Sequence, residues 1–85
     1  GVDEIDLTAL LTLALGTDVE GDGAAGGTPD YVHYNDVTGA LTVDQAGNAA
    51  SGGGDVVATL STGLANESIK ILFDDGAGGT GSDTV

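Results

Sequence analysis

The sequence predicts a mainly β fold, a small antiparallel β-sandwich or β-roll-like domain with one short N-terminal helix. Short runs rich in apolar and β-branched residues recur along the 85 residues, and acidic, glycine-rich segments separate them. One stripe of leucines at helical spacing accounts for the helix. Because the chain is short, we expect a single domain over 1–85. It comprises a strand and the helix in 1–16, strands in 29–75 and a glycine-rich segment in 76–85.

The N-terminal segment predicts a strand followed by a helix. Residues 2–7 favour a short strand, because Ile5 and Leu7 share one face. A helix of about two turns is expected over 8–15, since the apolar residues there recur at i, i+3 and i+4. This stripe consists of Leu7, Leu10, Leu11, Ala14 and Leu15. It is too short to span a membrane, so we expect it to pack into the core.

The middle of the chain predicts three further strands. Residues 29–44 are typical of a hairpin, with strand-forming residues, a turn ending at Gly39 and then an alternating run. Residues 55–60 predict a third, buried strand. In residues 69–73 the side chains of Ile69, Ile71 and Phe73 alternate and are expected to face the core.

The glycine-rich end has an informative spacing. The repeat Gly-Gly-x-Gly-x-Asp-x-apolar-x is matched at every fixed position by Gly78, Gly79, Gly81, Asp83 and Val85. Successive copies of this repeat build parallel β-rolls that bind calcium between turns, so one copy supplies half a site. The alternative, which the residue types alone favour, is a flexible acidic tail after the last strand.

Charge excludes several classes of partner. Fourteen Asp and Glu residues face a single cation, Lys70, which gives a formal net charge of −13. Such a chain repels nucleic acid and anionic lipid, and no apolar run is long enough for membrane insertion. Eleven of the acids are Asp, which suits turns and loop-borne calcium sites. Cysteine is absent, so disulfides and thiolate metal sites are excluded.

The sequence shows no catalytic constellation, and we expect a protein that is not an enzyme. The single histidine, His33, lies within a predicted strand, where a surface or packing role is the commoner one. None of the four serines lies in a Gly-x-Ser-x-Gly turn. Calcium binding is therefore the site chemistry that the residues favour.

The expected calcium ligands fall into three groups. The first group comprises the carboxylates of Asp74, Asp75 and Asp83 and the backbone carbonyls of Gly76, Gly78 and Gly79. The second comprises Asp3 and Asp6, which could complete the half-site from the same or a neighbouring copy. The third comprises Asp18, Glu20 and Asp22, which alternate like the first ligands of an EF-hand loop, although no glutamate closes that pattern.

The order of these segments resembles the C-terminal secretion-target domain of large repeats-in-toxin (RTX) proteins and adhesins that are exported by type I secretion. Residues 3–11 (DEIDLTALL) look like the family's opening Asp-x-Ile-Asp-Leu-Ser-x-Leu-Leu. The motifs YVHY, GALTVD, VATL and IKILF then follow, at 31–34, 39–44, 57–60 and 69–73.

The resemblance implies a location outside the cell or on the bacterial cell surface, calcium-dependent folding, an uncleaved export signal and no catalysis. Two features depart from the family. The usual tandem of glycine-rich nonapeptides is missing before the domain. The sequence Asp44-Gln45-Ala46-Gly47-Asn48 stands where the family often has Asp-x-Asp-Gly.

A second hypothesis from the same composition is a subunit of a self-assembling extracellular filament or surface layer. Such a subunit would form a homo-oligomer or head-to-tail polymer, with pairing through edge strands at 69–73 or 30–36. The two hypotheses differ in oligomeric state, because an export domain is expected to be a monomer.

Overall fold

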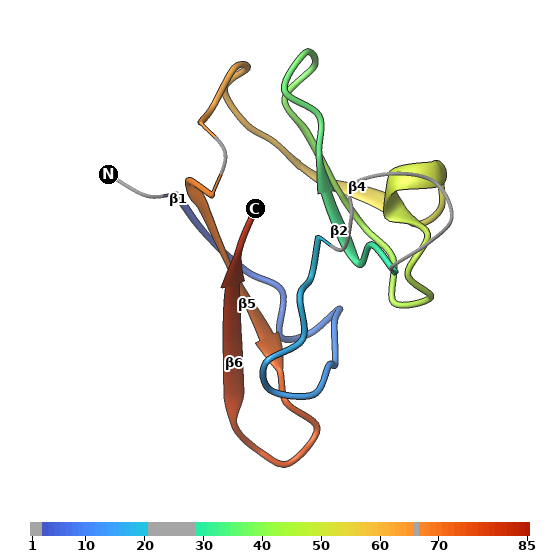
Figure 1. Ribbon diagram of the computed structural model, residues 1–85, viewed down its shortest axis with the longest axis vertical. Coiled ribbons are helices and arrows are strands. Elements are labelled where there is room, and N and C mark those ends of the chain that lie inside the picture. Colours follow the sequence, from blue (N-terminus) through green and yellow to red (C-terminus); the bar gives the residue numbers. More distant parts are fainter. Residues whose placement is uncertain (1–2, 21–28, 66) are drawn as a thin grey trace.

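The described part of the chain folds into strands that join in two small sheets (Figure 1). The computed structural model describes residues 3–20, 29–65 and 67–85. Their strands are β1 (Asp3–Asp6), β2 (Val32–Tyr34), β3 (Ala40–Val43), β4 (Asp55–Thr59), β5 (Ile69–Asp74) and β6 (Thr80–Thr84). A short 3-10 helix, η1, covers Ala49–Ser51. The prediction of a mainly β fold is confirmed, and no helix in the described ranges is long and apolar enough to cross a membrane.

The first sheet has β5 at its centre, in the order β1-β5-β6. β1 runs parallel to β5, with Asp3 opposite Ile69, whereas β6 runs antiparallel, with Thr80 opposite Asp74. The predicted strand at 69–73 is thus confirmed. Its predicted role as an assembly edge is wrong, because both of its edges are already hydrogen-bonded to β1 and β6.

The second sheet has the order β2-β3-β4 and contains the predicted hairpin. Val32 of β2 lies opposite Val43 of β3 in an antiparallel ladder. The connecting turn is held by Asn35, whose Oδ1 accepts the backbone N–H of Val37 at 2.9 Å and of Thr38 at 3.2 Å. Gly39 then takes φ +80°, and a Cβ there would lie 2.1 Å from the Leu60 carbonyl oxygen. Only glycine fits this position without a shift of the backbone.

The strand predicted at 55–60 forms as β4, but the prediction that it is buried is wrong. β4 lies at the edge of its sheet and pairs antiparallel with β3, with an irregularity in register between Leu41 and Thr42. Asp55, Val56 and Thr59 are exposed. A run of apolar residues favours burial, but the sequence does not reveal whether a strand has neighbours on both sides.

The helix predicted over 8–15 is also wrong. One turn forms, in which Leu7 O accepts the N–H groups of Leu10 and Leu11 at 2.9 and 2.8 Å. The chain then extends: Leu13 N donates to Asp74 O at 2.9 Å and Asp74 N donates to Leu11 O at 3.0 Å. Leu11 and Leu13 are buried, whereas Leu10 remains 56% exposed. Backbone pairing with the end of β5 therefore prevails over the local helical spacing.

The glycine-rich end forms an ordered hairpin with β5. The turn between β5 and β6 contains Gly76 and Gly78 at φ +79° and +88°, and β6 follows at Thr80–Thr84. Gly81 is buried against Phe73, since a Cβ there would lie 2.4 Å from the ring. Because β6 returns antiparallel to β5, this segment differs from a β-roll, where each glycine turn leads into a parallel strand of the next coil.

One hydrophobic core connects the two sheets. Ile69, Ile71 and Phe73 of β5 are fully buried, as their alternation predicts. Val32, Leu41 and Val43 bring the second sheet into the same cluster, and Val85 joins it from the end of β6. Segment 18–20 crosses between the sheets: Val19 is fully buried, and its carbonyl oxygen accepts the N–H groups of Tyr31 and Val32 at 2.7 and 3.0 Å.

Candidate functional site

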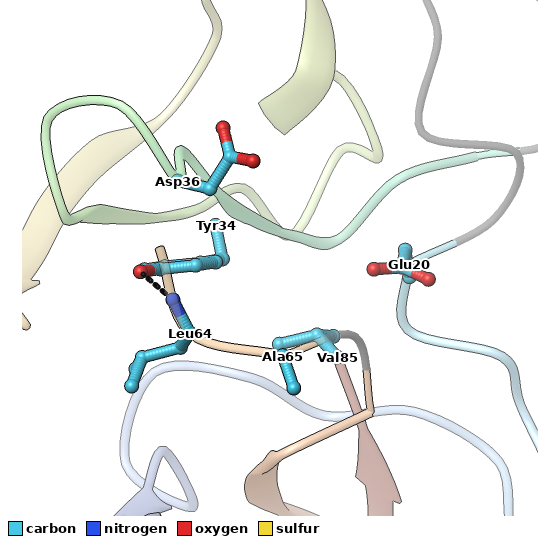
Figure 2. Close-up of a pocket in the computed structure, with 6 residues that line it drawn as sticks. All are labelled: Glu20, Tyr34, Asp36, Leu64, Ala65 and Val85. Atoms are coloured by element: carbon cyan, nitrogen blue, oxygen red, sulfur yellow. Dashed lines mark hydrogen bonds between the residues drawn. The ribbon is translucent and has the colours of Figure 1, made fainter. Parts of the chain in front are cut away.

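A pocket of about 260 Å³ opens where segment 18–20, the β2–β3 hairpin and the C-terminal residue meet. Figure 2 shows the residues that line it, which are Glu20, Tyr34, Asp36, Leu64, Ala65 and Val85. The carboxylates of Glu20 and Asp36 stand apart on two sides of the pocket, and the ring of Tyr34 lies between Asp36 and Leu64. The lining thus combines apolar surface with two acidic side chains.

Tyr34 closes one side of this pocket through its hydroxyl group. The hydroxyl donates to the carbonyl oxygen of Ser61 and accepts the backbone N–H of Leu64 at 3.2 Å (Figure 2). These bonds hold the connection between β4 and β5 against the hairpin. The sequence indicated that Tyr34 is a strand residue, but its hydroxyl partners lie about 30 residues away and leave no local pattern.

Glu20 lies among four other acidic residues. Burial raises the pKa of Glu20 above its ordinary value of 4.5, and the neighbouring negative charges raise it further. Those charges belong to Glu67, Asp18, Asp30 and Asp83. We call these five acids the Glu20 cluster; they come from segment 18–20, the start of the hairpin, the connection before β5, and β6. Four stretches of chain therefore bring like charges together on folding.

Members of the Glu20 cluster also serve as structural acceptors. Asp83 Oδ2 accepts the backbone N–H of Val19 at 3.0 Å, which ties β6 to segment 18–20. Glu67 accepts the hydroxyl of Thr84 and takes φ +62°, a left-handed conformation that is uncommon for a residue other than glycine. Asp30 is 2% exposed. Backbone and hydroxyl donors thus use part of the acceptor capacity of these carboxylates.

The first group of expected calcium ligands is divided by the fold. Asp74 and Asp75 lie at the β5–β6 turn, whereas Asp83 lies three residues along β6 from the partner of Asp74. At the usual rise per strand residue this separates their backbones by about 10 Å. Asp83 lies near Glu20 instead, although the sequence placed Asp83 in the first group of expected ligands and Glu20 in the third.

The aspartates of this turn bind backbone N–H groups. Asp74 Oδ1 accepts from Gly76 at 2.9 Å, and Asp75 Oδ1 accepts from Ala77 at 2.7 Å and from Gly79 at 2.9 Å. The bonds from Ala77 and Gly79 lower the pKa of Asp75 below its ordinary value. These carboxylates therefore stabilise the turn by themselves.

The remaining predicted ligands are distributed along the first sheet and segment 18–20. Asp6 Oδ1 accepts the backbone N–H of Thr8 at 3.0 Å and its hydroxyl at 2.7 Å, and both bonds lower the pKa of Asp6. Asp3 is paired with Ile69 in the β1–β5 ladder. Asp18 Oδ1 accepts the N–H of Glu20 at 3.1 Å. Asp22 lies outside the described residues.

The described acidic side chains therefore provide only part of a calcium site. Within 3–20, 29–65 and 67–85, no group of three or more histidine, aspartate or glutamate side chains is close enough to hold a metal ion as it stands. The Glu20 cluster brings negative charge to one region without forming a complete set of ligands. Such an arrangement attracts cations and leaves much of their coordination to water.

Glu20→Gln is predicted to raise the thermal midpoint at pH 7 by about 2–5 °C, the size expected for losing a modest charge repulsion in a small domain. The pKa of Glu20 is higher in the folded than in the unfolded chain, so its ionised form costs stability at neutral pH. Protonation regains this stability as the pH falls toward the ordinary value of 4.5, and the advantage of the variant should shrink over that range. Calorimetry of the variant and the parent between pH 7 and 4.5 measures this difference in thermal midpoint.

Glu4→Gln is the matched control, because Glu4 is exposed and forms a 3.7 Å ion pair with Lys70. Such surface pairs contribute little, so this change should leave the midpoint nearly unaltered or slightly lower. A Glu20 variant no more stable than the parent at pH 7 would contradict the repulsion assigned to the cluster.

No family model, curated protein or solved structure matches this chain.

Proposed function

We propose that this chain is a non-enzymatic, extracellular β module that calcium stabilises, and that it serves as a structural or secretion domain of an RTX-like protein or adhesin. The observation that carries the proposal is the Glu20 cluster. Folding gathers its carboxylates, and burial together with these neighbouring charges raises the pKa of Glu20. A divalent cation bound there would offset the repulsion in the folded state alone and would stabilise it by mass action.

The distribution of charge supports the same proposal. The chain carries a net charge of −13, and its one lysine pairs with Glu4 on the first sheet. The negative field of the chain therefore attracts cations from the medium. Glu20 and its neighbours Asp18 and Asp83 would provide some of the carboxylate oxygens that calcium prefers, and water would complete the coordination. Extracellular fluids hold calcium at concentrations that suit weak sites of this kind.

Calcium should raise the thermal midpoint in a saturable way; a concentration of 100 times Kd would add about 2.7 kcal/mol of stability. The double variant Asp18→Asn with Glu20→Gln should lose most of this gain. The control double variant, Asp74→Asn with Asp75→Asn, removes the same charge and keeps acceptors for the turn, and should retain the gain. Differential scanning calorimetry and sedimentation velocity, with calcium or chelator, measure both stability and mass.

Several outcomes of this experiment count against the proposal. An equal gain from sodium chloride at matched ionic strength would show general screening in place of a calcium site. If only the control double variant lost the calcium-dependent rise in thermal midpoint, the calcium site would lie at the β5–β6 turn instead. Rapid sedimentation on calcium addition would favour the alternative function, a subunit of a self-assembling filament or surface layer, for which the edge strands β2 and β4 provide pairing positions.

The secretion part of the proposal rests on the resemblance to RTX export domains and is tested by export itself. A reporter protein fused ahead of this chain should reach the medium, uncleaved, in bacteria that carry a type I exporter. The same fusion without residues 69–85 should stay in the cell, as should the full fusion in a strain without the exporter. Retention of the full fusion in the exporting strain would overturn this part and leave only a calcium-stabilised module.

A further inference from the structure

β4 is an edge strand of the described structure. It lies at one end of the order β2-β3-β4, and among the described residues it pairs with β3 alone. The opposite edge of the sheet, β2, is approached by segment 18–20, whose Val19 carbonyl oxygen accepts the N–H groups of Tyr31 and Val32. An extended strand with one unpaired side can accept a further strand through backbone hydrogen bonds.

The side chains of β4 leave this edge unprotected. Its sequence, DVVAT, contains neither lysine nor proline, and Val56 is 60% exposed. The outer strands of the first sheet are different: β1 is DEID, with three acids in four residues, and β6 is the polar TGSDT. Charged or polar side chains on an edge discourage strand addition, and in β4 they stand only at its two ends, with the exposed Val56 between them.

A groove of about 220 Å³ lies where β3 ends and β4 begins, and residues of both strands line it. Leu10, Val43 and Val57 give it apolar surface, and Leu10 is 56% exposed. Asp44 and Asp55 also line it and add negative charge. A strand added to β4 would place alternate side chains next to Asp55 and Val57, which line the groove from β4, so that a cationic group meets the aspartate and an aliphatic group meets the valine.

Charge decides which occupant the groove favours. A second copy of the chain would bring another 13 net negative charges and offer only Lys70, which already pairs with Glu4. A basic segment would gain from the field of the whole protein as well as from Asp44 and Asp55. We propose that β4 binds an extended segment of a different protein, in which lysine or arginine flanks an aliphatic residue on one face. This inference is independent of calcium binding at the Glu20 cluster.

The test uses the peptide acetyl-Lys-Thr-Val-Thr-Lys-amide and isotope-labelled full chain in heteronuclear NMR titrations. We expect saturable shifts in the amides of residues 54–59 and in Leu10. Replacing the central valine of the peptide by proline removes a backbone donor and should abolish these shifts. The same peptide with glutamate in place of both lysines should not bind.

Two matched pairs of protein variants separate the site from the overall charge. Asp55→Asn should weaken binding by about fivefold or more, whereas Asp36→Asn, which removes the same charge from the exposed β2–β3 turn, should leave it unchanged. Val56→Lys should likewise abolish binding, and Val37→Lys should not, because Val37 is 80% exposed on that same turn.

Three results would overturn the inference. If Asp55→Asn and Asp36→Asn weakened peptide binding equally, the peptide would be responding to the net charge of the protein and not to a site at β4. Shifts centred on the Glu20 cluster, with β4 unaffected, would place the basic segment elsewhere. Concentration-dependent shifts of residues 54–59 without peptide would identify a second copy as the occupant of β4.

Discussion

The structure depends on β5, a strand that pairs with a neighbour on each edge and also supplies the centre of the core. β5 hydrogen-bonds to β1 on one edge and to β6 on the other, so both ends of the described chain are fixed to it. Its residues alternate between fully buried and half-buried, and Ile69, Ile71 and Phe73 form the centre of the core. With few aromatic residues available, this face supplies much of the apolar burial that stabilises a domain of this size. The second sheet then packs its own apolar residues against the same cluster.

The abundance of aspartate has two physical origins in this fold. Asp6, Asp18, Asp44, Asp74 and Asp75 each accept the N–H of the residue two positions ahead, a short reach that aspartate makes and glutamate does not. These carboxylates stabilise turns by themselves. Asp18 belongs as well to the Glu20 cluster, where acids from separate stretches of the chain meet and where burial, together with the neighbouring negative charges, raises the pKa of Glu20. An acidic composition alone therefore does not identify a cation site; what distinguishes the Glu20 cluster is that its acids come from separate stretches of the chain.

Local patterns predicted the elements whose partners are near in sequence. Alternation gave the strands at 40–43 and 69–73, and Gly39 marked the hairpin turn. The failures share a cause, which is pairing across long stretches of chain. Residues 11–13 extend because they bond to Asp74, and Asp83 approaches Glu20 because segment 18–20 crosses to β6. The exposure of β4 follows from its place in the sheet, which no local spacing encodes. The sequence therefore indicated Asp18, Glu20 and Asp83 as candidate ligands, but not that Asp83 lies near the other two.

Native-state hydrogen exchange tests the central role of β5 most directly, because it reports the free energy at which each amide opens. The hydrogen-bonded amides of Ile69–Asp74 should exchange most slowly, at the rate set by global unfolding, and those of β4 should exchange faster, since β4 is an exposed edge. If β5 opened while the β2-β3-β4 sheet remained protected, the two sheets would be independent units, and the account of one core organised on β5 would be wrong.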